Sequence, residues 1–107
     1  MSAMIDIMNR EARQLVAIVA AVSGETFNTI LYGGRRRPLP ICRYLVAREL
    51  VNRGYSSMEA GRQLGIDHVT VLYGIHQLDT MKDAAYEREL DIQHLLTYVI
   101  ENIEIEP

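Results

Sequence analysis

The sequence predicts an all-α fold of five or six helices in a single domain, on three observations. Its 107 residues match the usual size of one domain. Apolar residues recur at three- and four-residue spacing in several segments, as in amphipathic helices. No alternation typical of a strand is longer than the one over residues 101–106. We therefore expect one domain over residues 1–107, with a core over residues 10–80 and an acidic helix over residues 81–105.

The first two helices are predicted from apolar spacing and from the glycines that follow them. Gly24 can end the first helix in a left-handed conformation. Residues 25–31 are long enough for a short second helix, and Gly33 and Gly34 end it. The apolar residues at helical spacing in the first helix are Leu15, Ile18, Val19 and Val22.

A basic loop from Arg35 to Pro40 comes next, followed by a third helix. Pro38 and Pro40 are expected to exclude helix from this loop and to stiffen it into an extended path. The third helix is predicted over residues 41–53, and Gly54 provides its C-terminal stop. Its expected apolar side consists of Ile41, Tyr44, Leu45 and Val51.

Two helices joined by a tight turn are predicted after Gly54. Ser56 or Ser57 can cap the first, which ends near Leu64, and Gly65 can take the positive φ of the turn. Asp67 is placed as the N-cap of the second. The expected buried stripe of the second helix is Val71, Leu72, Ile75 and Leu78. Its outward residues are His68, Val69, Thr70, Tyr73, His76 and Gln77. This arrangement is typical of a helix-turn-helix.

The last predicted helix is amphipathic and rich in acidic residues. Its expected apolar stripe consists of Ile92, Leu95, Leu96, Val99 and Ile103. This stripe can close the core of the domain. Alternatively, it can form the interface of a homodimer or bind a protein partner from the replication or transposition machinery.

The formal net charge of −3 hides an uneven distribution along the chain. Residues 35–76 hold seven arginines and three acids, a charge of +4, whereas residues 77–107 hold eight acids and two basic residues, a charge of −6. Three arginines, Arg35, Arg36 and Arg37, are adjacent, and a short loop cannot pair all of them internally. Arginine is suited to forked contacts with phosphate and guanine. The basic segment therefore predicts an anionic partner, with a solvated charged surface as the alternative.

Little in the sequence predicts chemistry other than binding. Cys42 is the only cysteine, which excludes an internal disulfide and fits a reducing cytoplasm. His68 and His76 lie about two helical turns apart, which is too far for a paired metal site. The sequence contains no Walker A loop, no nucleophile–base arrangement and no apolar run long enough to span a membrane. We expect a cytoplasmic protein that is not an enzyme and has no metal, nucleotide or other cofactor.

Four short motifs follow one another as they do in one known family. They are Ala-Arg-Glu-Leu at residues 47–50, Glu-Ala-Gly at 59–61, Leu-Gly at 64–65 and Asp-His-Val-Thr-Val-Leu at 67–72. Together they resemble the C-terminal DNA-binding domain of the bacterial replication initiator DnaA. The resemblance covers residues of about 10–80 and implies a DnaA-type, Trp-repressor-like helix-turn-helix fold. Because the chain lacks a Walker A loop, it resembles that domain used alone.

The resemblance also implies roles for individual residues. The start of the second helix of the motif would contact bases, through Asp67, His68, Val69 and Thr70. One arginine of the basic loop, Arg35, Arg36 or Arg37, would enter the adjacent minor groove. Arg48 would lie against the phosphate backbone. Further candidates for phosphate contacts are Arg43, Ser57 and Tyr73.

The sequence departs from the family pattern at three places near these residues. Val69 replaces the first threonine of Asp-His-Thr-Thr, which removes a hydroxyl but leaves methyl groups that can contact thymine. The turn at residues 65–67 is one residue shorter than the family's Gly-Gly-Arg-Asp and lacks its arginine. Residues 40–42 read Pro-Ile-Cys where the family has Pro-Arg-Gln, so a basic side chain is missing.

The expected function is sequence-selective binding of double-stranded DNA through the helix-turn-helix. Such a protein would act in replication initiation or its control, or as a regulator of a phage or mobile element. One alternative is a protein-interaction adaptor derived from a DNA-binding domain. Another is a different helix-turn-helix regulator or a transposition protein. No membrane partner is expected.

Overall fold

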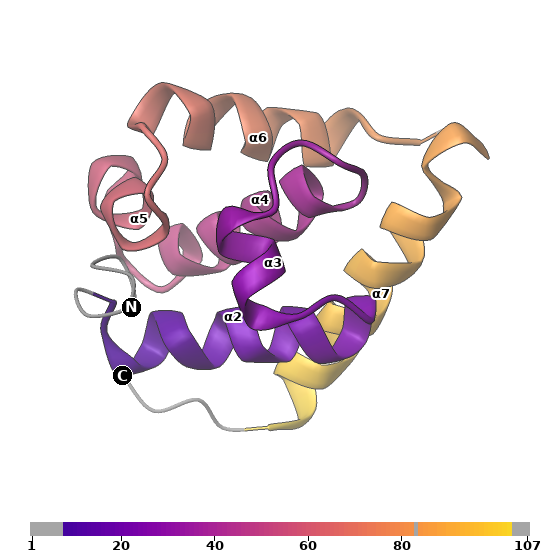
Figure 1. Ribbon diagram of the computed structural model, residues 1–107, viewed down its shortest axis with the longest axis horizontal. Helices are drawn as coiled ribbons and strands as arrows, with labels where there is room; N and C mark the ends of the chain where they lie inside the picture. Colours follow the sequence, from indigo (N-terminus) through magenta and orange to yellow (C-terminus); the bar gives the residue numbers. More distant parts are fainter. Residues whose placement is uncertain (1–7, 83, 104–107) are drawn as a thin grey trace.

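The computed structural model describes residues 8–82 and 84–103, and every regular element in that part of the chain is helical (Figure 1). The elements are α2 (Arg10–Ser23), α3 (Phe27–Tyr32), α4 (Leu39–Asn52), α5 (Ser57–Leu64), α6 (His68–Thr80), the 3₁₀ helix η1 (Ala84–Tyr86) and α7 (Glu87–Asn102). This confirms the all-α prediction. The predicted helix-turn-helix corresponds to α5 and α6.

Helix α4 lies at the centre of the fold, between α6 on one side and α2 on the other (Figure 1). It also packs against α3 and α5. Its buried residues therefore lie on several faces: Leu39, Ile41, Cys42, Leu45, Val46, Ala47 and Leu50. The single apolar side predicted for this helix was incomplete, because a helix surrounded by neighbours has no one apolar stripe.

Helices α5 and α6 begin at polar residues that the sequence marks as caps. Ser56, rather than Ser57, caps α5: its hydroxyl accepts the backbone N–H of Glu59 at 3.1 Å, and the Glu59 carboxylate accepts the N–H of Ser56 at 3.0 Å. This reciprocal pair is a capping box. Gly24 and Gly65 end α2 and α5 with φ of 78° and 72°, which confirms their predicted left-handed conformation.

The predicted start of the third helix was wrong by two residues. Helix α4 begins at Leu39, and Pro40 lies in its first turn instead of in an extended loop. A proline is tolerated there because the first N–H groups of a helix have no partner within the helix. The N–H of Leu39 donates to the carbonyl of Arg36 at 2.8 Å, so the basic loop turns directly into the helix.

Two predicted apolar stripes are narrower in the structure than expected. In α6 the buried residues are Val71, Gly74 and Leu78, whereas Leu72 is 55% exposed and Ile75 is only partly buried. Gly74, which has no side chain, faces Tyr44 of α4, and in this orientation of α6 Leu72 lies on the outer side of the helix. Leu72 was therefore wrongly placed in the core.

Helix α7 also buries a narrower apolar stripe than predicted, for a different reason. Only Glu89, Ile92 and Leu96 are buried, while Leu95 is 52% exposed and Ile103 is 45% exposed. Because α7 packs mainly against α2, only one narrow stripe is covered. The helix also begins at Glu87 instead of residue 81, since Met81 ends α6 in an extended conformation. Residues 104 and 105 of the predicted helix lie outside the described part of the chain.

The thiol of Cys42 is fully buried in α4. Burial raises the pKa of this thiol above its usual value, which leaves little thiolate to react. We expect a maleimide reagent to modify the native protein at least about 100-fold more slowly than the unfolded protein, because reaction requires opening of the core. Mass spectrometry over time in buffer and in denaturant measures both rates. Equal rates would contradict the burial of Cys42.

Candidate nucleic-acid interface

The turn between α5 and α6 is set by a close contact between two backbone segments. The N–H of Ile66 donates to the carbonyl of Gly61 at 3.0 Å. A β-carbon at Gly61 would come well inside 3.0 Å of the carbonyl oxygen of Ile66. Only glycine permits this approach, and Gly65 supplies the positive φ that the turn needs. These two glycines fix the angle at which α6 leaves the turn.

The first turn of α6 presents short side chains to the exterior. Asp67 caps the helix and accepts the backbone N–H of Thr70 at 3.0 Å. This bond lowers the pKa of the Asp67 carboxyl, so the group stays ionised at the positive end of the helix dipole. His68 and Val69 are exposed, Val69 to 62%, and Thr70 is partly exposed.

Helix α6 is held close to α4 by a ring that rests on a glycine. A β-carbon at Gly74 would overlap the ring of Tyr44, so this ring of α4 packs directly on the backbone of α6. Tyr44 also meets Tyr73 edge to face, with ring centroids 6.4 Å apart and an interplanar angle of 84°. Tyr73 nevertheless remains 60% exposed, so its hydroxyl lies at the surface.

A groove of about 580 Å³ separates the basic loop from α6. Arg35 lies on the wall formed by the loop, and Tyr44 lies on the side of α4. The opposite wall comes from successive turns of α6, with Thr70, Tyr73 and Gln77, and from the cap Asp67. Figure 1 shows the loop that follows α3 running beside α6. The groove therefore brings together one predicted loop residue and several predicted residues of the helix-turn-helix.

The three adjacent arginines of the loop have different surroundings. Arg36 donates to the Glu25 carboxylate at 2.8 Å, and Arg37 donates to the Glu89 carboxylate at 2.7 Å. Within the described residues, Arg35 forms no ion pair and its side chain lines the groove. The structure thus separates one arginine that faces α6 from two that pair with acids.

Arg43, predicted to contact phosphate, has a structural role in this loop. Its guanidinium donates to the carbonyl of Ile30 at 2.6 Å and to the carbonyl of Gly34. These bonds tie α4 to the end of α3 and to the start of the basic loop. Arg43 lines the groove as well, so its charge lies close to any anion held there.

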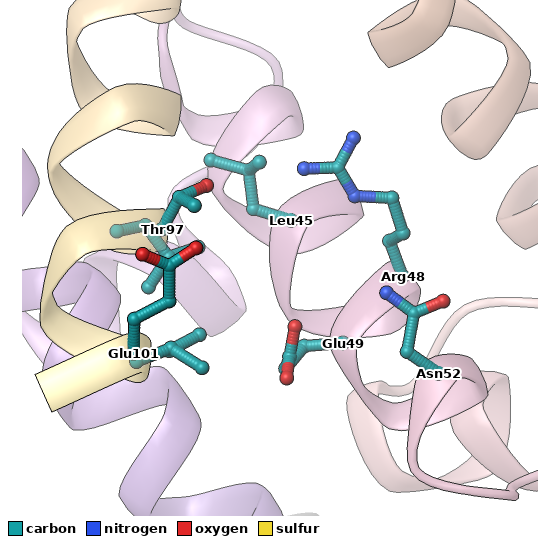
Figure 2. A pocket seen from close by; sticks show the side chains of 8 residues that line it. Leu45, Arg48, Glu49, Asn52, Thr97 and Glu101 are labelled. Carbon is teal, nitrogen blue, oxygen red and sulfur yellow. The ribbon is translucent and has the colours of Figure 1, made fainter. Parts of the chain in front are cut away.

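Two other predicted phosphate contacts lie outside the groove. Arg48 lines a separate cleft of about 390 Å³ between α4 and α7, which Glu49 and Glu101 also line. Figure 2 shows Arg48 on the α4 side of this cleft and Glu101 projecting from α7 on the other side. Ser57 is the first residue of α5 and is partly buried. The structure does not bring either residue into contact with the groove.

Tyr44 and Gln77, two residues with polar side chains that line the groove, were given no binding role from the sequence. Tyr44 was assigned to the core, although it is only partly buried. Gln77 was placed on the outer face of α6 without a role. The signal for Gln77 was its spacing, because Thr70, Tyr73 and Gln77 lie three and four residues apart and so share one side of a helix.

Comparison with known protein families, curated proteins and solved structures gives no match to this chain. Among the described residues, no three histidine, cysteine or acidic side chains are grouped closely enough to hold a metal ion. None of the described helices combines the length and apolar character needed to cross a membrane. We therefore infer function from the groove and its side chains.

Proposed function

We propose that this protein binds double-stranded DNA sequence-selectively through α6 and the basic loop. One observation carries the proposal: Arg35 and the first turn of α6 lie on opposite walls of one groove. Among the described residues Arg35 has no acidic partner, and it shares the groove with a capped helix start that carries short polar side chains, an arrangement suited to a DNA strand.

The groove suits one sugar-phosphate strand passing between the two walls. In B-DNA a single strand separates the major groove from the adjacent minor groove. If the N-terminal turn of α6 enters the major groove, an element that reaches the minor groove must cross that strand. Arg35 is the side chain on that far wall, and a narrow minor groove attracts arginine through its negative potential. Arg43 and the Tyr73 hydroxyl would then lie near the phosphates of the strand between them.

Base selectivity would come from the exposed start of α6. Thr70 can donate or accept a hydrogen bond, and its methyl group can contact thymine. Val69 adds an apolar surface suited to a thymine methyl, and His68 can donate to a purine nitrogen or a phosphate. Asp67 is held as the helix cap, so a role in accepting from cytosine would be secondary to its bond with Thr70.

The resemblance to the initiator family supports a role in replication initiation or its control, or in regulating a phage or mobile element. The motif at residues 67–72 falls at the start of α6, where such a role needs it. A binding site selected from a random duplex library would separate these roles. Recovery of the initiator family's own site would favour replication, and an unrelated site would favour a regulator.

Replacing Thr70 with alanine tests base selectivity. We expect binding to the selected duplex to weaken by about 1–3 kcal/mol, because one contact with a base edge is lost. Binding to a scrambled duplex should be unchanged. Fluorescence polarisation with both duplexes gives the two affinities, and Thr80→Ala, at the exposed other end of α6, is the matched control. Equal losses on both duplexes would contradict base contact by Thr70.

The exposed apolar side chains of α6 favour a second candidate, a protein-interaction adaptor. Val69, Leu72 and Tyr73 are each more than half exposed and lie on neighbouring turns. Contiguous apolar surface on a helix is typical of a protein interface. Absence of binding to any duplex at low salt, where phosphate contacts are strongest, would favour the adaptor over DNA binding.

A further inference from the structure

Glu89, a buried acid of α7, is paired with Arg37 of the basic loop. Glu89 is only 2% exposed, and both of its carboxylate oxygens accept from Arg37, at 2.7 Å and 3.1 Å. The same guanidinium donates to the carbonyl of Ala85 and lies 5.0 Å from the ring centroid of Tyr86. A forked arginine–carboxylate pair with an aromatic neighbour fixes both position and orientation.

A second connection joins the loop to α7 through Glu25. Arg36 donates to one oxygen of Glu25 at 2.8 Å, and Arg88 of α7 donates to the other at 3.3 Å. Arg88 also donates to the carbonyl of Ser23. Each of the two loop arginines beside Arg35 is therefore paired with an acid, and both pairs involve residues on or next to α7.

We propose that Glu89 is a positioning residue for DNA binding, because it holds the basic loop so that Arg35 faces α6 across the groove. The inference rests on the proposed function. It makes α7 part of the DNA-binding unit, although the charged residues of α7 are mostly acidic and do not line the groove. Helix α7, in the acidic C-terminal part of the chain, then restrains the basic loop in addition to closing the core.

Loss of Glu89 should change DNA affinity in opposite directions under the two explanations, a positioning role and simple electrostatics. Removing a negative charge from a protein that binds a polyanion should strengthen binding when the acid has no other role. If Glu89 positions the loop, its loss weakens binding, because DNA must then order a loose loop. The cost of ordering one such side chain corresponds to about 2- to 10-fold in affinity.

The test compares Glu89→Gln with Glu87→Gln, an exposed acid two residues earlier on α7. Affinities for the selected duplex are measured by fluorescence polarisation at fixed salt. We expect Glu89→Gln to bind about 2- to 10-fold more weakly, and Glu87→Gln to bind equally or more tightly. Equal or tighter binding by Glu89→Gln would overturn the proposal.

A double variant separates positioning from general destabilisation. If Glu89 acts through Arg35, the variant Arg35→Ala with Glu89→Gln should bind no more than about 2-fold more weakly than Arg35→Ala alone. Fully additive losses would overturn the proposal. If Glu89→Gln does not fold, Arg37→Ala tests the same contact from its exposed partner, with the same expectation of non-additivity with Arg35→Ala.

Hydrogen exchange without DNA keeps this test distinct from the proposed function. In Glu89→Gln, amides of residues 33–37 should exchange faster while those of α4 and α6 are unchanged. Unchanged exchange in the loop would overturn the positioning role. If the wild-type protein bound no duplex at low salt, DNA binding would fail as a function. The exchange result would still show whether Glu89 restrains the loop.

Discussion

Alanine in place of Gly61 is expected to destabilise the protein by about 2 kcal/mol and to abolish selective DNA binding. The added β-carbon would overlap the carbonyl oxygen of Ile66, which belongs to the backbone and cannot rotate away. Overpacking of this kind costs about 1–3 kcal/mol or more. The better helix propensity of alanine recovers at most about 1 kcal/mol of that cost. The turn must therefore shift, and α6 shifts with it.

Denaturant unfolding followed by circular dichroism measures the loss of stability caused by Gly61→Ala. Met58→Ala is the matched control, since it places alanine at a 66% exposed position of the same helix and should change stability by no more than about 0.5 kcal/mol. Binding to the selected and scrambled duplexes then reports on the placement of α6. A Gly61→Ala variant as stable as the wild type would contradict the close approach of α5 and the turn.

The parts of the fold that could be predicted from sequence are those set by neighbouring residues. The capping box of Ser56 and Glu59 and the cap at Asp67 depend on side chains three residues from the N–H groups that they accept. Gly65 has a positive φ because the tight turn after α5 requires it, and this requirement does not depend on distant parts of the chain. Local rules therefore located the helix-turn-helix and the start of α6.

The features that the sequence did not predict depend on distant parts of the chain. Leu72 was assigned to the core from its spacing, but the face of α6 that is buried is decided by Tyr44 resting on Gly74. Arg43 was predicted to contact phosphate, and its bonds to the carbonyls of Ile30 and Gly34 add a structural role that its spacing did not predict. Spacing within one helix contains no information about such neighbours.

The same reason prevented a choice among the three loop arginines. Their sequence neighbourhood is almost identical, and all three are basic residues before a proline. What distinguishes them is an acid 11 residues away for Arg36 and an acid 52 residues away for Arg37. Only the packed structure brings these acids to the loop, and this leaves Arg35 facing the groove.

Arg35→Ala is expected to weaken binding to the selected duplex by roughly 10- to 100-fold. A hydrogen bond to a charged group contributes about 1.5–3 kcal/mol, and loss of one phosphate-neutralising charge lowers the magnitude of the salt slope by about 0.9. If Arg35 enters the minor groove, the preference for A·T pairs at the flanking positions should fall as well. Fluorescence polarisation across a salt series, with duplexes that differ only in those flanks, measures all three effects.

Arg36→Ala is the control that gives this experiment its meaning. It removes the same charge from the adjacent residue, but that guanidinium is already paired with Glu25. Glu25 keeps Arg88 as a second partner, so the change should leave no unpaired acid. A diffuse basic patch would lose equal affinity in both variants, since long-range attraction depends on charge and not on direction. A much larger loss for Arg35→Ala would show a positioned contact, and equal losses would contradict it.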